Sequence, residues 1–240
     1  MHNIIKRITA SVVGTVMLSV TAAGSCLFSS AVVNENKYPV MGVDVSNYQG
    51  DICWKDFEQQ NVSFAFIKAT EGSGFIDGSA AYNLSESAKT DIIVSAYHFF
   101  SFDSPGETQA ENYISVVRPE DIDMPPVVDI EYYGNKKDNK PSAEETEKIL
   151  RPLLEKLEQH YGVKPIIYTT LPVYNRYIKD VFSDSYPLWI RNIWCEPQLI
   201  DWKFWQYSDH GELYGFNGEE KYIDLNVYNG SEEEFRREFQ

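Results

Sequence analysis

The sequence contains few of the side chains that bind transition metals or act as strong nucleophiles. It has three cysteines and four histidines in 240 residues, and none of them forms an HExxH or CxxC arrangement. It also lacks the GxGxxG and phosphate-loop patterns, and Gly72-Ser73-Gly74 is not flanked as a nucleophile elbow would be. These absences argue against zinc hydrolysis, nucleotide chemistry and serine-hydrolase catalysis, so we expect no metal and no cofactor.

Positive charge is scarce as well. The chain has 21 Lys and Arg against 36 Asp and Glu, a formal net charge of -15. An acidic surface repels phosphate backbones and anionic lipids, which argues against nucleic acid or a membrane surface as the partner. Low-complexity stretches and internal repeats are absent from the sequence. We therefore expect one domain that is a monomer and holds its ligand in its own cleft.

The N-terminal stretch has the order of an export signal. Lys6 and Arg7 precede an uncharged run over residues 8–24. We favour cleavage after Ala31; lipidation at Cys26 and an uncleaved membrane anchor are the alternatives. The predicted organisation is a signal peptide (1–31), a short linker (32–38) and one folded domain (39–240), in a protein that is secreted or on the cell surface.

Two cysteines, Cys53 and Cys195, remain after such a cleavage. In an oxidising compartment they could form a disulfide, but a long separation in sequence says nothing about their distance in space. A disulfide and two unpaired thiols both stay open.

Short apolar runs rich in Val, Ile, Phe and Tyr alternate with helical patterns. Near-continuous apolar strands are typical of a parallel sheet buried on both faces. Eight strands are predicted, at residues 41–45, 64–69, 93–99, 127–130, 165–169, 188–190, 204–207 and 223–227.

Two helices between these strands have clear start signals. Ser104 and Glu107 have capping-box spacing with Pro105 at the first helical position, and Ser142 and Glu145 repeat the device before a helix that ends at Gly162. Helical periodicity weakens after residue 170. The sequence therefore predicts an α/β fold, an irregular TIM-like barrel with five βα units and three further strands.

Acidic residues stand at several predicted strand ends, where active sites of barrels are built. Asp129 and Glu131 are two apart, so their side chains face the same way and are about 6.5 to 7 Å apart along the backbone. Like charges in an apolar setting keep one carboxyl protonated while its neighbour stays ionised. Glycosidic bond cleavage requires that division of labour. Asp44 lies near the end of the first predicted strand, and Asp224 lies at the beginning of the eighth.

Several strand motifs, taken in order from about residue 38 to the C-terminus, resemble those of glycoside hydrolase family 25. They are Met41-Gly42-Val43-Asp44-Val45-Ser46-Asn47-Tyr48-Gln49-Gly50, Phe66-Ile67-Lys68-Ala69-Thr70-Glu71-Gly72, Ala96-Tyr97-His98-Phe99, Val128-Asp129-Ile130-Glu131, Ile167-Tyr168-Thr169, Trp205-Gln206-Tyr207 and Ile223-Asp224-Leu225-Asn226. The resemblance implies a cofactor-free lysozyme that hydrolyses the β-1,4 bond between N-acetylmuramic acid and N-acetylglucosamine in peptidoglycan glycan strands, with residues 39–240 as its catalytic barrel.

The resemblance also implies roles for single residues. Glu131 matches the general acid, Asp129 the carboxylate beside it, and Asp44 and Asp224 two further acids of the cleft. The candidate substrate-binding residues are Tyr48, Gln49, Lys68, Glu71, Tyr97, His98, Tyr168, Trp205 and Gln206. For His98 the alternative is a histidine whose hydrogen bonds are satisfied within the protein.

Some features leave alternatives open. Arg191 stands where the family pattern suggests a small residue, which bears on substrate detail rather than on the carboxylates. We prefer a route in which the acetamido group of the substrate is the nucleophile and Asp129 assists it. The competing functions are a non-catalytic wall-binding barrel and a hydrolase of chitin-type N-acetylglucosamine polymers.

Overall fold

The computed structural model describes residues 33–34 and 36–240. The predicted signal peptide (1–31) and part of the predicted linker lie outside the described residues. Within the described part, no helix is long and apolar enough to cross a membrane.

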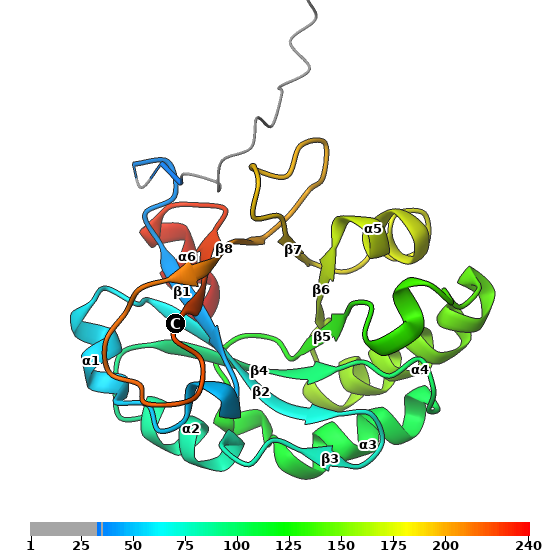
Figure 1. Cartoon of the computed structure of the whole chain (residues 1–240), viewed down its shortest axis with the longest axis horizontal. Coiled ribbons are helices and arrows are strands. Elements are labelled where there is room, and N and C mark those ends of the chain that lie inside the picture. The colour runs from blue at the N-terminus through cyan, green and yellow to red at the C-terminus, as the bar shows by residue number, and fades with distance from the viewer. Residues whose placement is uncertain (1–32, 35) are drawn as a thin grey trace, which may run out of the picture.

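Eight strands form a closed barrel (Figure 1). All eight lie where the sequence predicts them, with ends that differ by a few residues. They are β1 Met41–Val45, β2 Phe64–Glu71, β4 Ile93–Phe99, β5 Val127–Ile130, β6 Ile166–Thr170, β7 Leu188–Arg191, β8 Phe204–Gly211 and β9 Ile223–Tyr228. A ninth strand that the sequence analysis missed, β3 Phe75–Ile76, pairs with the end of β2 outside the barrel.

The barrel is parallel from β1 through β8, but β9 runs antiparallel to both of its neighbours, β8 and β1. The start of β9 therefore lies at the same end of the barrel as the ends of the other strands. In this register Asp224 is paired with Asp44. The apolar pattern of β9 did not reveal this direction.

Large aromatic side chains fill the barrel interior. Phe64, Phe66, Trp189 and Phe204 are at most 2% exposed, and the rings of Phe66 and Trp189 stack at a centroid distance of 4.1 Å. Phe66 also packs edge-on against Phe204 at 5.1 Å. The interior is thus a packed core, as is usual for eight-stranded α/β barrels, and a ligand has access only at the ends.

Helices cover the outside of the barrel unevenly (Figure 1). Residues 192–222, all of them described, contain no helix, and the helix after β6 is a single turn followed by a π-helical segment at residues 174–178. This arrangement confirms the predicted irregular barrel with a poorly helical second half. The helices are α1 Trp54–Gln59, α2 Ala80–Ser87, α3 Gly106–Val116, α4 Ala143–Tyr161, α5 Leu171–Val173 and α6 Glu232–Phe239.

The two predicted capping boxes have opposite outcomes. Ser142 and Glu145 cap α4 reciprocally, and Gly162 ends that helix with a left-handed φ of 73°. The box at Ser104 is wrong: the N-cap of α3 is Pro105, which makes no side-chain cap, and Ser104 Oγ is buried without a hydrogen-bond partner among the described residues. Instead, the carbonyl of Ser104 accepts a bond from Gln109.

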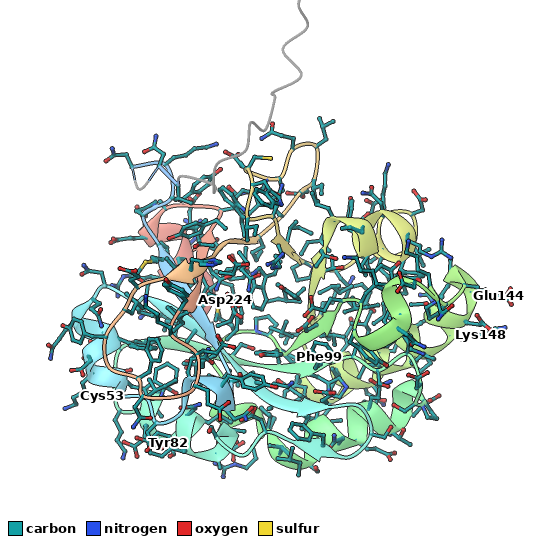
Figure 2. All side chains as sticks on the ribbon, viewed as in Figure 1. Cys53, Tyr82, Phe99, Glu144, Lys148 and Asp224 are labelled. Carbon is teal, nitrogen blue, oxygen red and sulfur yellow. The ribbon has the colours of Figure 1, made fainter. Side chains whose placement is uncertain are left out.

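The structure also answers whether Cys53 and Cys195 are paired with each other. Cys53 is a free thiol exposed at the periphery of the molecule (Figure 2), so it does not form a disulfide with Cys195.

The two serines provide a matched test of the helix caps. Ser142→Ala should lower the free energy of unfolding by about 1 kcal/mol, because it removes the hydroxyl that accepts from Glu145 N and donates to Glu145 Oε2. Ser104→Ala should change it by less than about 0.5 kcal/mol, because that hydroxyl has no partner to lose. Urea denaturation of both variants measures the difference, and equal losses would contradict the assignment of the caps.

Candidate active site

A cavity of about 380 Å³ opens at the carboxyl-terminal ends of the parallel strands. All four predicted carboxylates line it, together with five of the predicted substrate-binding residues. Asp224 and Phe99 approach it from opposite sides of the barrel (Figure 2). The predicted residues that line the cavity are Asp44, Asp129, Glu131, Asp224, Tyr48, Gln49, Lys68, Tyr97 and Tyr168.

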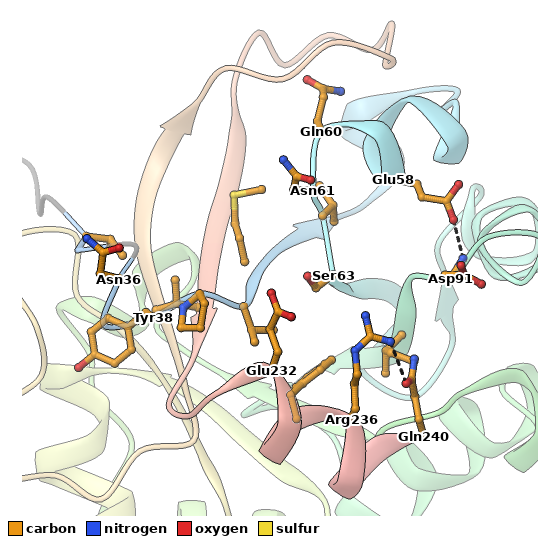
Figure 3. A pocket seen from close by; sticks show the side chains of 18 of the residues that line it. Asn36, Tyr38, Glu58, Gln60, Asn61, Ser63, Asp91, Glu232, Arg236 and Gln240 are labelled. Atoms are coloured by element: carbon orange, nitrogen blue, oxygen red, sulfur yellow. Dashed lines mark hydrogen bonds between the residues drawn. The ribbon is translucent and has the colours of Figure 1, made fainter.

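A larger cavity of about 670 Å³ lies at the opposite end of the barrel (Figure 3). Met41 and Ile93 line it where β1 and β4 begin, and α6 contributes Glu232 and Arg236. The hydrogen bonds drawn there are local: Asp91 N donates to Glu58, and Arg236 donates to Gln240. Among the described residues that line this cavity, no buried acidic pair converges on it, so its size does not make it the site of chemistry.

Asp129 and Glu131 extend from the end of the fully buried strand β5. Asp129 is 7% exposed, and its Oδ1 atom has no hydrogen-bond partner among the described residues. Burial, followed by the charge of Glu131, raises the pKa of Asp129 well above its ordinary value. Burial also raises the pKa of Glu131, although the positive charges of Arg191 and Lys68 oppose that rise. The pair therefore retains a proton at a pH where free carboxyl groups have lost theirs.

Asp44 and Asp224 form a second acidic pair, on the other side of the cavity. The side chain of Gln206 donates to both, at 2.8 Å to Asp44 Oδ2 and 3.2 Å to Asp224 Oδ2, and Asn226 donates to Asp44 Oδ2 at 2.8 Å. Burial and the neighbouring charge of Asp44 raise the pKa of Asp224 to about 9. Burial raises the pKa of Asp44 too, but the two amide donors oppose this. Asp224 is thus the protonated member of the pair, and it hydrogen-bonds to Asp44.

Two buried aromatic side chains hold these amides in place. Tyr168 OH donates to Gln206 Oε1 at 2.9 Å, and Trp189 Nε1 donates to Asn226 Oδ1 at 2.8 Å. Each amide therefore has its oxygen occupied and its NH₂ group directed at the carboxylates. Gln206, predicted to contact sugar, is 1% exposed and instead positions the acidic pair.

Asn226 was not among the predicted site residues. A sequence signal for it existed, because it follows Asp224 by two positions on one strand and so faces the same way.

Lys68 and Gln49, two other predicted substrate-binding residues, also line the cavity, and each makes a hydrogen bond within the protein. Lys68 Nζ bonds Glu71 Oε2 at 2.9 Å and lies 4.9 Å from the centroid of the Phe99 ring. Gln49 Oε1 accepts from the backbone N of Ser46 at 2.8 Å, which closes a capping box on a short 3-10 helix over residues 47–49. Glu71 itself does not line the cavity.

His98 and Trp205 are buried away from the cavity, which does not fit the predicted substrate contact. His98 is fully buried: its Nδ1 lies 2.7 Å from Thr70 Oγ1 and its Nε2 3.1 Å from Gln109 Oε1. Since Ser101 N also donates to Gln109 Oε1, the bond from His98 is best made by a protonated Nε2. Burial lowers the pKa of His98 to about 4, so it is neutral. Trp205 Nε1 donates to the carbonyl of Asn192 in the core.

Sequence reasoning missed the part of the cavity wall formed by the end of β8 and the connection to β9. Asp209 lines the cavity from β8, and Glu220 and Tyr222 line it from the connection. Arg191, noted as unusual in the sequence, bonds Asp209 Oδ2 at 2.8 Å and supplies positive charge beside the carboxylates. None of these residues has a strand-end motif, because β8 is lengthened and bulged and the connection that follows is irregular.

Among the described residues, no group of three or more His, Cys, Asp or Glu side chains has the geometry to hold a metal ion. The four carboxylates instead form two proton-holding pairs on facing walls. Such an arrangement can donate a proton to one side of a bond while it presents negative charge to the other side.

The Asp224 pair makes stability depend on pH. A carboxyl whose pKa is raised in the folded state stabilises the protein at low pH, and this contribution is lost as the pH rises from its ordinary 3.8 through about 9. Asp224→Asn removes this titration and keeps a donor beside Asp44. We expect Tm of the wild type to fall more steeply than that of Asp224→Asn between pH 5 and 9, a window inside that range. Parallel Tm profiles measured by scanning calorimetry would refute the raised pKa.

Comparisons of the sequence and of the structure with known proteins point to the same family. The sequence model of the family described as "Glycosyl hydrolases family 25" matches residues 43–216. A solved family 25 glycosyl hydrolase from Bacillus anthracis is 49% identical and superposes with a TM-score of 0.81, covering 89% of this chain and 99% of that one. The protein YegX of Escherichia coli O157:H7, described as uncharacterized, is 34% identical over 83% of this chain and 73% of its own length. Lysozyme M1 of Streptomyces globisporus is 30% identical over 80% of this chain and 68% of its own length.

Proposed function

Because the chain belongs to family 25 of the glycosyl hydrolases, we propose that it is a lysozyme that hydrolyses the β-1,4 bond between N-acetylmuramic acid and N-acetylglucosamine in peptidoglycan. The observation that carries this proposal is the pair of Asp129 and Glu131, which face one cavity and share a retained proton. Relatives support it, since Lysozyme M1 is 30% identical to this chain.

Glu131 is the general acid of the proposed reaction. The pair of Asp129 and Glu131 retains a proton, because burial raises the pKa of both groups. In the proposed reaction Glu131 delivers this proton to the glycosidic oxygen of the leaving sugar, while the acetamido N–H that binds Asp129 favours the ionised form of Asp129. After that sugar departs, the ionised Glu131 takes a proton from water and directs the water to the anomeric carbon. Arg191 and Lys68 favour this ionised form in the second step.

Asp129 assists the acetamido group of the substrate. The backbone rises about 6.5 to 7 Å between residues two apart in extended chain, which favours a separation of the two carboxyls greater than the roughly 5 to 5.5 Å of a direct-nucleophile pair. The acetamido oxygen of the N-acetylmuramic acid then attacks the anomeric carbon instead. The unpartnered Oδ1 of Asp129 is a buried acceptor suited to the acetamido N–H, and its negative charge stabilises the positive ring that forms.

Asp44 and Asp224 form the opposite wall. Asp224 carries the proton, and Asp44 keeps its charge through the amides of Gln206 and Asn226. We assign this pair to substrate orientation and to stabilisation of the positive charge that develops at the anomeric carbon.

We also propose that the protein is secreted or attached to the cell surface, and that it is a monomer. The order of Lys6, Arg7 and the uncharged run after them supports export. Peptidoglycan lies outside the cytoplasmic membrane, so such a location gives the enzyme access to its substrate.

Replacement of the acid tests both the cleaved bond and the catalyst. Glu131→Gln keeps the shape of the side chain but carries no transferable proton, so we expect kcat to fall by about 10²- to 10⁴-fold. The assay is mass spectrometry of the muropeptides that the enzyme lacking residues 1–31 releases from purified peptidoglycan. Glu144→Gln, an exposed glutamate on α4 (Figure 2), is the matched control and should retain full activity. Absence of new muramic acid reducing ends with folded wild-type enzyme would overturn the proposal.

Stereochemistry tests the role of Asp129. Attack by the acetamido group followed by attack of water inverts the anomeric carbon twice, so the first product should have the β configuration in proton NMR spectra. Asp129→Asn should lower kcat by at least about 10²-fold with little change in KM, because it removes charge needed chiefly in the transition state. An α-configured first product would exclude this route.

A further inference from the structure

Two apolar side chains are exposed on β3, the strand added outside the barrel. Phe75 is 51% exposed and Ile76 is 52% exposed. Within the described part of the chain, strand β3 pairs only with the end of β2, through Thr70 with Ile76 and Glu71 with Phe75. Closure of the barrel does not require this hairpin, so its exposed apolar side chains are not explained by packing.

The hairpin is held rigidly. Asn112 from α3, 9% exposed, donates its side-chain amide to the carbonyls of Gly72 at 2.9 Å and Phe75 at 3.0 Å. Ser73 Oγ lies 2.6 Å from Thr108 Oγ1, which ties the turn to the same helix. A surface ordered before binding loses little conformational entropy when a ligand docks on it.

The ring of Phe75 continues the wall of the catalytic cavity. Lys68 Nζ lies 5.6 Å from the centroid of the Phe75 ring and 4.9 Å from that of Phe99. Lys68 and Phe99 both line the cavity that contains Glu131. Side chains alternate along a strand, so Phe75 lies on the cavity side and Ile76 faces away from it.

We propose that the β2–β3 hairpin is an outer subsite in which the Phe75 ring stacks on an N-acetylhexosamine unit of the glycan strand, beyond the sugars at the cleaved bond. This inference rests on the proposed function. A cavity of about 380 Å³ is small for a polymer, so the strand must leave it across the rim.

The surroundings of Phe75 fit a neutral sugar. The C–H face of a pyranose ring is apolar and packs on an aromatic ring, while its hydroxyl groups point outward at the edge. The Lys68–Glu71 ion pair lies beside the ring and offers both a donor and an acceptor to those hydroxyls. The net charge of -15 disfavours the carboxylates of peptide stems, so the glycan is the occupant.

The test compares two neighbouring residues on two substrates of different length. Phe75→Ala should raise KM for a peptidoglycan octasaccharide about tenfold and leave kcat unchanged, because the ring binds ground state and transition state equally. For a tetrasaccharide the change should stay below about twofold, since the glycan does not reach the subsite. Phe75→Tyr should keep the wild-type KM for the octasaccharide. Ile76 is equally exposed but lies on the other face, so Ile76→Ala should leave KM unchanged for both substrates.

Two outcomes would overturn the subsite: an equal effect of Phe75→Ala on both glycans, or an equal effect of Ile76→Ala on the octasaccharide. A binding measurement on an inactive variant tests the subsite independently of the proposed activity. The octasaccharide is titrated by calorimetry into Glu131→Gln with and without Phe75→Ala. About tenfold weaker binding without the ring supports the subsite even if the wild type cleaves neither glycan, and an equal Kd refutes it even if cleavage is confirmed.

Discussion

The antiparallel direction of β9 is the constraint on which the active site depends. The strands β1 to β8 of the described barrel are parallel, and β9 closes the gap between β8 and β1. Its first residues therefore lie where the other strands end, and Asp224 is in register with Asp44. With a parallel eighth strand, Asp224 would lie at the other end of the barrel and Asp44 would have no acidic partner.

The buried polar network below the carboxylates makes this acidic cluster tolerable. Gln206 and Asn226 direct amide donors at Asp44, and Tyr168 and Trp189 hold the amides from behind. Burying like charges costs folding free energy, and the raised pKa values are the measure of that cost. Asp129 Oδ1 is the exception to the satisfied network, which suits an acceptor reserved for substrate.

The irregular half of the barrel shapes the cleft edge. No helix occurs in residues 192–222, all of them described, so the extended β8 and the connection after it are free to form a wall. Asp209 and Tyr222 line the cavity from there, and Arg191 is paired with Asp209. The β2–β3 hairpin adds Phe75 at another part of the rim. Both additions to the simple barrel thus extend the wall around the carboxylates.

The sequence by itself determined the positions of the eight barrel strands and the acidic candidates, because apolar periodicity and strand-end carboxylates are local patterns. It also identified the cap of α4, which is a contact between residues three apart. It missed the direction of β9, which depends on pairing with strands far away in the chain, and the unused hydroxyl of Ser104. It left open whether His98 contacts substrate or has its hydrogen bonds satisfied within the protein, and the structure shows the second arrangement. Which carboxyl keeps a proton, and which polar side chains line the cavity rather than support it, were decided by the tertiary structure alone. The physical reason is that burial and charge proximity act through space, whereas the sequence records only proximity along the chain.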